Sequence, residues 1–599
     1  MAVINGTNGT DTLIGTNEDD VIHGRGGDDV LIGGAGADTL DGGAGFDTAD
    51  YAWSSAGINI DLRSGVSLPG VGGDAQGDTL KNIEKVIGSD YDDTFATTLA
   101  GRTLEGGRGN DTYIVNAGGT NIIEESGWAG GYDDQVLTNQ SRYTLDANIE
   151  RLTYTGSGKF TGFGNASDNV ITGGEGNDVL LGGAGADQLI GGAGWDTASY
   201  TDSAEGLTLD LKYGAYTSGI ATGDTFSDIE AIRGSNHDDV IMAGGAFKAL
   251  DGAGGFDTVD YSMSEQGITL DIRNGTGKPG IGGDAEGVTL KNIEHIVGTI
   301  WGDTYVINTP GVTISEQGFG SGIDEIRTGL ATYTMDANIE SLTYTGKGSF
   351  TGHGNAGDNT LTGGAGNDVL SGGEGADHLI GGAGLDTASY ADSTEGLTVD
   401  LIAGQLSTGA AAGDAYTGIE RVLGSNYDDH FRAIDLQIGI DGGAGFDTVD
   451  YSWSSDALNI NLREPGTGAD ALTHVEKVIG SFGADTFTTS IGGVTFEGGD
   501  GDDTYIINTS SLVTILDNGR SNTTGDTLVL NNVASATDLN LLRVGDDLFL
   551  YSRLDSQAEV PDHGVKLQDW YAGSNTIENF QAANGDVLPV NADAFSLFG

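Results

Sequence analysis

Cysteine is absent from the 599 residues, and only 25 lysines and arginines stand against 89 aspartates and glutamates. The absence of cysteine excludes disulfides, thiolate metal sites and cysteine nucleophiles. The scarcity of basic residues argues against nucleic-acid binding, which needs a lysine- and arginine-rich surface. Since no run of 18 apolar residues occurs, we expect no membrane-spanning segment. The first residues, MAVINGTNGTD, lack the basic and apolar regions of a Sec signal peptide, so we expect none.

The most regular feature present is a nine-residue repeat rich in glycine, a residue that occurs 105 times. The stretch GGAGADTLDGGAGFDTAD (33–50) holds two copies of the pattern G-G-x-G-x-D-x-U-x, in which U is apolar. Read in nines from Gly6, the sixth position is aspartate in five successive repeats, and similar blocks return at 164–199 and 354–389. Glycines at the first, second and fourth positions permit positive φ, so the repeat predicts a tight turn followed by a short strand.

A second period, of 18 residues, persists where the glycine turn has decayed. Four pairs of aspartates outside the main blocks show it: Asp93 and Asp111, Asp239 and Asp257, Asp429 and Asp447, and Asp485 and Asp503. Between the members of each pair lies a nonapeptide, such as TTLAGRTLE (97–105), that keeps an apolar eighth residue. Two nonapeptides therefore form one coil, and turns 18 residues apart are expected to stack at about one strand spacing, ~4.8 Å.

Stacked turns would bring the sixth-position carboxylates of successive coils together, for example Asp11 over Asp29. Two carboxylates so close repel each other unless they share a cation. Turn carbonyls can complete a shell of about 6–8 oxygens, which suits Ca²⁺ better than Mg²⁺, and the eight scattered histidines disfavour softer metals. We therefore predict several Ca²⁺ ions as cofactor. The predicted ligands are Asp11, Asp20, Asp29, Asp38, Asp47, Asp93, Asp111, Asp178, Asp187, Asp196, Asp239, Asp257, Asp303, Asp368, Asp377, Asp386, Asp429, Asp447, Asp485 and Asp503.

A metal-free alternative is that the periodic Asp and Gly form a purely structural turn, like the asparagine ladders of some β-solenoids. Asn169 and Asn359 stand at sixth positions, where they keep an oxygen ligand but lose the charge, so sites that use them should be weaker. Nine pairs with one ion each would bind about 18 positive charges. Because the net charge is −64, most of the acidity is expected at the surface.

Segments with alternating apolar residues separate the nonapeptide blocks, and the whole arrangement repeats. YTLDANIERLTYTG at 143 returns as YTMDANIESLTYTG at 333, and the same shift of 190 carries Asp178 to Asp368. No segment has helical periodicity, so we predict an all-β tandem solenoid of parallel strands with a small β-rich C-terminal cap. The predicted parts are 1–163, 164–353, 354–525 and the cap at 526–599.

The nonapeptides and their spacing resemble the repeats-in-toxin (RTX, haemolysin-type) calcium-binding repeats, which form parallel β-rolls. The segment from about 526 to 590 is similar to the domain that accompanies such repeats. The resemblance implies tandem β-roll or β-helix blocks, secretion by a type I system with an uncleaved C-terminal signal, and folding when calcium is met outside the cell. The tail NADAFSLFG (591–599) is compatible with that signal.

Motifs for catalysis are absent or without the right context. GHGNAG (352–357) matches G-x-G-x-x-G, but it opens a turn block rather than a helix. H-E-x-x-H and G-x-S-x-G do not occur. We expect no catalytic residues and no enzyme, with a carboxylate pair on the solenoid as the open alternative. The aromatic residues of DYAWS (50–54) and DYSWS (450–454) are expected to pack over the ends of the rolls rather than to stack on carbohydrate.

Because the repeats fill almost the whole chain, the sequence predicts a secreted calcium-binding structural protein on or around the bacterial cell surface. It would assemble with itself as an S-layer lattice or as a biofilm-matrix filament. The further expected partners are surface polysaccharide and the type I secretion machinery. Two alternatives are a calcium-dependent adhesin that binds glycans and an extracellular polysaccharide-modifying enzyme.

Overall fold

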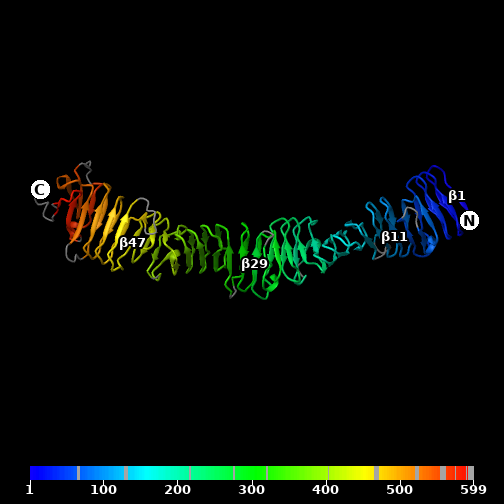
Figure 1. Cartoon of the computed structure of the whole chain (residues 1–599), viewed down its shortest axis with the longest axis horizontal. Coiled ribbons are helices and arrows are strands. Elements are labelled where there is room, and N and C mark those ends of the chain that lie inside the picture. The colour runs from blue at the N-terminus through cyan, green and yellow to red at the C-terminus, as the bar shows by residue number, and fades with distance from the viewer. Residues whose placement is uncertain are drawn as a thin grey trace. The chain divides into compact units, whose positions relative to one another are not determined.

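The computed structural model consists of short strands stacked as rungs along the chain (Figure 1). It describes residues 1–63, 68–126, 133–214, 217–273, 277–318, 322–402, 404–463, 471–519, 525–553, 561–573, 575, 577–588 and 590. The predicted tail signal at 591–599 lies outside these residues. The chain forms two compact units, Met1–Thr299 with Gly311–Ile314 and Ile300–Pro310 with Ser315–Gly599.

Strand pairing in the first block follows the 18-residue period. Thr12 pairs with Val30 in parallel, and Val21 pairs with Thr39 in the same way. Further along, Thr48 pairs with Lys85, 37 residues later, because a longer excursion separates two strands that still stack as consecutive rungs. The all-β solenoid of parallel strands is therefore confirmed, and the coil length varies while the register is kept.

Four sheets of the first unit, each given in spatial order, cover most of its strands. The first is β1 (Val3–Asn5), β3 (Val21–His23), β5 (Thr39–Asp41) and β9 (Thr79–Lys81). The second is β14 (Asn121–Ile123), β12 (Thr103–Glu105), β10 (Lys85–Ile87), β6 (Thr48–Asp50), β4 (Val30–Ile32) and β2 (Thr12–Ile14). The third is β24 (Thr225–Ser227), β21 (Gln188–Ala193), β19 (Val170–Glu175), β17 (Arg151–Tyr154), β15 (Gln135–Thr138), β13 (Thr112–Val115), β11 (Thr94–Thr97), β7 (Asn59–Asp61) and β8 (Leu68–Val71). The fourth is β16 (Arg142–Thr144), β18 (Thr161–Phe163), β20 (Val179–Leu181), β22 (Thr197–Ser199), β25 (Ala231–Arg233), β27 (Ala249–Asp251) and β30 (Thr289–Lys291).

The other strands of this unit follow the same parallel arrangement. A further row holds β23 (Thr208–Asp210), β26 (Val240–Met242), β28 (Thr258–Asp260) and β31 (His295–Val297). Two strands lie near the end of the unit, β29 (Thr269–Ile272) and β33 (Thr313–Ser315). Short 3-10 helices occur in the longer excursions of both units: η1 (Gly73–Ala75), η2 (Gly219–Ala221), η3 (Gly283–Ala285), η4 (Gly409–Ala411), η5 (Ala536–Asp538) and η6 (Trp570–Ala572).

Three rows of strands build the second unit. The first is β32 (Thr304–Ile307), β34 (Glu325–Thr328), β36 (Ser341–Tyr344), β38 (Thr360–Ala365), β40 (His378–Ala383) and β43 (Ala415–Thr417). The second is β35 (Thr332–Thr334), β37 (Thr351–His353), β39 (Val369–Ser371), β41 (Thr387–Ser389), β44 (Arg421–Leu423), β46 (Gly439–Asp441), β49 (Leu472–Thr473), β48 (Asn459–Leu462), β51 (Thr486–Thr489), β53 (Thr504–Ile507), β55 (Asp526–Leu530) and β59 (Ile577–Ala582). The third is β42 (Thr398–Asp400), β45 (His430–Arg432), β47 (Thr448–Asp450), β50 (Lys477–Ile479), β52 (Thr495–Glu497), β54 (Val513–Leu516), β58 (Val565–Leu567), β57 (Asp547–Ser552) and β56 (Leu539–Val544).

The core is a narrow column of apolar side chains at the middle position of each strand. In the first block this position is Ile22, Leu31, Leu40 and Ala49, and all four are fully buried. Burial of about 1.5–3 kcal/mol per large aliphatic side chain, repeated on every rung, stabilises the stack. The third strand residue points the other way, so three residues suffice to hold a rung.

The C-terminal end is β-rich, as predicted. β55 and β59 extend the parallel row, whereas β56, β57 and β58 form an antiparallel meander that joins the solenoid through parallel pairing of β58 with β54. A changed topology at the last rungs covers an edge that would otherwise be open to further strands. Within the described part of the chain, no helix has the length and apolar character needed to span a membrane.

Candidate calcium sites

Each of the 20 predicted aspartates is the residue immediately before a strand. All of them except Asp11 are buried, most by at least 97% of their surface. The glycine turn thus ends by directing a carboxylate inward at the point where the apolar column begins. Burial of so many carboxylates requires hydrogen bonds, cations or both.

Successive aspartates are joined by a hydrogen bond that the sequence did not predict. The backbone N–H of Asp20 donates to Oδ1 of Asp38 at 2.7 Å, and Asp38 donates in turn to Oδ1 of Asp78 at 2.7 Å. All nine predicted pairs are brought together in this way: Asp11–Asp29, Asp20–Asp38, Asp29–Asp47, Asp93–Asp111, Asp178–Asp196, Asp239–Asp257, Asp368–Asp386, Asp429–Asp447 and Asp485–Asp503. We use the term acid column for a series of acidic residues on successive rungs in which the backbone N–H of each residue donates to the carboxylate of the next.

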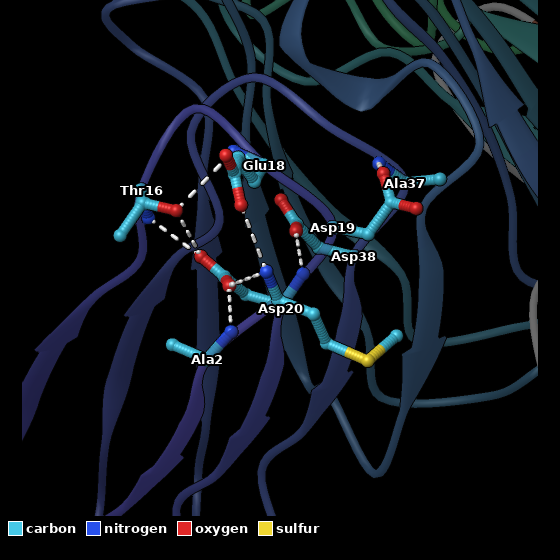
Figure 2. Close-up of polar contacts among 8 residues, drawn as sticks. Ala2, Thr16, Glu18, Asp19, Asp20, Ala37 and Asp38 are labelled. Carbon is cyan, nitrogen blue, oxygen red and sulfur yellow. Dashed lines mark hydrogen bonds and ion pairs between the residues drawn. The ribbon is translucent and has the colours of Figure 1, made fainter.

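In several columns the first aspartate has both oxygens bonded within the protein. Figure 2 shows Asp20, whose Oδ2 accepts from the N–H and the hydroxyl of Thr16, while Oδ1 accepts from the N–H of Ala2. These donors lower the pKa of Asp20, the N–H of Ala2 most strongly. A threonine or serine four residues earlier donates its N–H to the same oxygen in Asp11, Asp93, Asp239, Asp429 and Asp485.

Thirteen of the column aspartates keep one buried oxygen without a hydrogen-bond partner. Gly34, with φ of 86°, takes the place before Asp38 that Thr16 takes before Asp20, and Oδ2 of Asp38 has no donor. The same holds for Oδ2 of Asp29, Asp47, Asp111, Asp178, Asp187, Asp196, Asp257, Asp368, Asp377, Asp386, Asp447 and Asp503. A buried carboxylate oxygen without a donor is the group that a cation would satisfy.

The first glycine of the nonapeptide leaves the space beside this oxygen open. A Cβ on Gly33 would lie 2.5 Å from Oδ2 of Asp38, and one on Gly24 would lie 2.4 Å from Oδ2 of Asp29. Any side chain there would press on the oxygen that has no partner. The glycine and the aspartate five residues later therefore form one cradle.

Burial also opposes the charged form of these inner aspartates. It raises the pKa of Asp38 to about 6 and that of Asp187 and Asp257 to about 7. Neighbouring carboxylates of the columns add to the rise. A hard divalent cation bound between these carboxylates would favour their charged forms and so lower their pKa values. The oxygen-only surroundings fit Ca²⁺.

Asn169 and Asn359 do not behave as charge-free copies of these ligands. Oδ1 of Asn169 accepts from the N–H of Asn165 at 2.8 Å, and Nδ2 donates to the carbonyl of Ile149 at 2.9 Å. Asn359 has equivalent partners. Both ends of each amide are therefore used inside the protein, and no ion is needed to satisfy them.

The sequence reasoning missed the residues that close the columns. The N–H of Asp47 donates to Oε2 of Glu84, which belongs to the tripeptide Asn-Ile-Glu at 82–84. Asn82 has φ of 53° and Ile83 is buried, so the tripeptide is a left-handed turn that carries the glutamate into the column. Glutamates in similar tripeptides close further columns: Glu150, Glu230, Glu294, Glu340, Glu420 and Glu476. Glu578, in strand β59, closes another by accepting from the N–H of Asp526. The recurrence of this tripeptide was the available signal.

Buried tyrosines supply the second missed contact. The hydroxyl of Tyr51 donates to Oδ2 of Asp78, and Tyr200 and Tyr390 donate in the same way to Asp224 and Asp414. In these columns a phenol, rather than a threonine, satisfies the second oxygen. Asp78, Asp224 and Asp414 stand after long excursions, where no 18-residue spacing marks them.

We expect Gly33→Ala to weaken calcium binding in the first block and to lower the free energy of unfolding by about 1–3 kcal/mol, because the new methyl overlaps Oδ2 of Asp38. The matched control is Gly26→Ala, whose methyl would meet its nearest atom at 3.7 Å. Calorimetric calcium titration and thermal unfolding would measure both effects. Equal behaviour of the two variants would contradict the cradle.

Comparison with known proteins agrees with this geometry. The model of the RTX calcium-binding nonapeptide repeat (4 copies) matches residues 5–40, 14–49, 163–198, 353–388 and 479–506. This chain is an RTX-repeat protein. Its cofactor is Ca²⁺, and the matched segments hold six of the nine aspartate pairs described above; Asp93–Asp111, Asp239–Asp257 and Asp429–Asp447 lie outside them. RTX repeats typically occur in secreted proteins.

The RTX-repeat protein also shares a segment with an enzyme. It is 43% identical over 74 residues to the endo-1,3-1,4-beta-glycanase ExsH of Rhizobium meliloti (strain 1021). The similar segment is 12% of this chain and 15% of the glycanase. The chain thus spans a small part of that relative's length.

Proposed function

We propose that this RTX-repeat protein is a secreted structural protein that folds with calcium and assembles with itself on or around the bacterial cell surface, as an S-layer or matrix component. The observation that supports this is the extent of the acid columns, which run from Asp11 to Glu578. In the described part of the chain, β56–β58 are the main departure from stacked parallel rungs. Export by a type I system belongs to the same proposal.

The proposal assigns the chain no catalytic activity. The buried carboxylates of the columns accept hydrogen bonds from backbone N–H groups, as in the pair Asp20 and Asp38. This use holds them in the interior of the roll and away from a substrate. A structural and cation-binding role accounts for them without a reaction.

Titration of the protein with Ca²⁺ tests the assembly. We expect strand signal in circular dichroism and particle size in light scattering to rise together, because calcium completes the rolls whose surfaces then associate. Magnesium at the same concentration is the control and should do neither, since its octahedral shell fits these turns poorly. Folding to a stable monomer would contradict self-assembly and leave calcium binding intact.

Glycan binding is a second candidate, supported by two exposed tryptophans and by the similarity to a glycanase. Tyr51 and Tyr451 are buried as expected, but the prediction that the neighbouring tryptophans pack over the rolls is wrong: Trp53 is 86% and Trp453 62% exposed. The guanidinium of Arg432 lies 4.9 Å from the ring centre of Trp453. An indole beside a cation is a surface on which a sugar ring can stack.

Binding to an acidic polysaccharide would distinguish the two functions. If the chain is an adhesin, we expect Trp453→Ala to lower retention on an immobilised polysaccharide several-fold, with Met263→Ala, another exposed residue, as control. Release of reducing ends from the same polysaccharide would instead support an enzyme. Retention that Trp453→Ala leaves unchanged would count against glycan binding at this side chain.

A further inference from the structure

Among the residues that the structure describes, three places gather acidic side chains in a way that the nonapeptide turns do not. The groups are Asp111, Glu124 and Asp134, then Asp303, Glu316 and Asp324, and finally Asp503, Asp517 and Asp526. In each group one oxygen per residue lies within 4.8 Å of the other two. Two oxygens on opposite sides of a Ca²⁺ ion are separated by about 4.8 Å, twice its usual bond length. Each group is therefore compact enough to share one ion.

The additional acid stands where the coil normally has glycine. Parallel pairing of β12 with β14 sets Glu105 beside Ile123, so Glu124 lies in the same column as Gly106. A Cβ on Gly106 would lie 2.3 Å from Oε1 of Glu124 and 2.2 Å from Oδ2 of Asp111. Replacement of that glycine by glutamate one rung later turns the open cradle of an ordinary turn into a closed one.

Two of these carboxylates have an oxygen with no protein partner. Asp111 is fully buried and Glu124 is 8% exposed, and Oδ2 of the first and Oε2 of the second accept no hydrogen bond. Oε2 of Glu316 and Oδ2 of Asp503 are in the same situation in the other groups. These atoms are independent evidence for a ligand, because a purely structural cluster would satisfy its buried oxygens with donors.

A tyrosine holds the additional acid in place in all three groups. Tyr113 and Tyr305 donate their hydroxyls to Oε1 of Glu124 and Glu316, and Tyr505 donates to Oδ2 of Asp517 at 2.9 Å. Each tyrosine lies two residues after the column aspartate and is fully buried. The phenol orients one oxygen of the acid by a hydrogen bond.

We propose that each group is a calcium site of a second type, in which an additional acid reaches the column aspartate from the next rung and three carboxylates together bind one ion. The shared pattern is D-T-Y followed by an acid 13 or 14 residues after the aspartate. With three formal negative charges, such a site should hold Ca²⁺ more tightly than a turn that offers one unpartnered oxygen. These sites would act as fixed staples at intervals along the solenoid. The inference is additional to the proposed function and does not depend on self-assembly.

Counting bound ions in the full chain tests the proposal. We expect Glu124→Gln to bind one Ca²⁺ fewer in equilibrium dialysis with radioactive calcium, and Glu124→Gln/Glu316→Gln/Asp517→Asn to bind three fewer. The control Glu125→Gln, at an exposed neighbouring residue, should bind the wild-type number. A folded triple variant with the wild-type number would overturn the proposal, while the nonapeptide sites and the assembly would be unaffected.

A second measurement decides the matter if the triple variant does not fold. Tyr113→Phe keeps all three carboxylates and removes the hydroxyl beside the ion, and Tyr143→Phe removes a hydroxyl with no partner. With Tb³⁺ in place of calcium, we expect tyrosine-excited terbium emission to fall in Tyr113→Phe and to stay unchanged in Tyr143→Phe. Equal emission from the two variants would overturn the site at Asp111.

Discussion

Chelation of calcium at about pH 7.5 is expected to unfold most of the solenoid, and acidification of the same calcium-free protein to about pH 4.5 is expected to restore strand structure. The reason is the burial of carboxylates whose second oxygen has no donor, as in Asp38, Asp187 and Asp257. Without a cation they must either carry an unpaired buried charge or bind a proton. Each site that calcium fills contributes about 2.7 kcal/mol when the ion is at 100 times its dissociation constant.

The direction with pH follows from the raised pKa values. The pKa of Asp38 is about 6 and those of Asp187 and Asp257 about 7 in the folded chain, against about 3.9 when unfolded. A folded state with the higher pKa binds more protons, so this contribution to stability is complete below about pH 4 and is lost as pH rises towards about 7. Calcium replaces these protons and should be released less readily as pH rises.

Circular dichroism of the calcium-free protein between pH 4 and 8 would measure the effect, with the calcium-saturated protein as control. Calcium binding near pH 7 should also release protons, which appear as a dependence of the binding enthalpy on the buffer. Calcium-free protein that is equally stable at both ends of this range would contradict the argument. So would calcium binding without proton release.

Substitution of Asp38 by asparagine is expected to remove one calcium ion from the first block, whereas the same change at Asp20 should leave the number bound unchanged. The two residues are consecutive in one column, and both are 1% exposed. Oδ2 of Asp38 has no donor, but Oδ2 of Asp20 already accepts from Thr16 (Figure 2). The asparagine at 38 can keep Oδ1 as acceptor for the N–H of Asp20, so the backbone contact survives while the ligand charge is lost.

Native mass spectrometry of the full chain at saturating calcium would count the ions. Asp20→Asn serves as the matched control, since the residue has the same burial and chemistry and lies in the same column but has a different set of hydrogen-bond donors. The free energy of unfolding of Asp20→Asn should nevertheless fall, because an amide has one acceptor oxygen and cannot accept from both Thr16 and Ala2 as the carboxylate does. An equal loss of calcium in both variants would show that the hydrogen-bonded oxygens also bind ions.

Much of the fold was readable from local pattern. The 18-residue spacing of Asp29 and Asp47 predicted parallel coils, and the strands after these residues pair in that register. The predicted pairs of carboxylates are also the pairs that the structure joins. Sequence alone sufficed here because turn, strand and next turn are consecutive, so every contact of a coil is set by one constant spacing.

The glutamates that close the columns could not be predicted from a constant spacing. Asp47 is followed in its column by Glu84 and Asp134 by Glu150, at separations of 37 and 16 residues that share no period. Excursions of different length separate these residues, and only the strand register that the folded sheet imposes makes them neighbours. The same holds for Glu124, which becomes a neighbour of Asp111 and Asp134 through the pairing of β12 with β14.

The sequence by itself determined the all-β solenoid, its 18-residue coil, the paired aspartates and the calcium chemistry, because each follows from residues a constant distance apart. Tertiary structure decided which carboxylate oxygens are already bonded and which have no partner. Thr16 and Gly34 precede their aspartates by the same four residues, yet one donates to the carboxylate and the other, at φ of 86°, does not. The two residues already differ in the sequence, but only the folded backbone shows that the N–H of one reaches the carboxylate and that the N–H of the other does not.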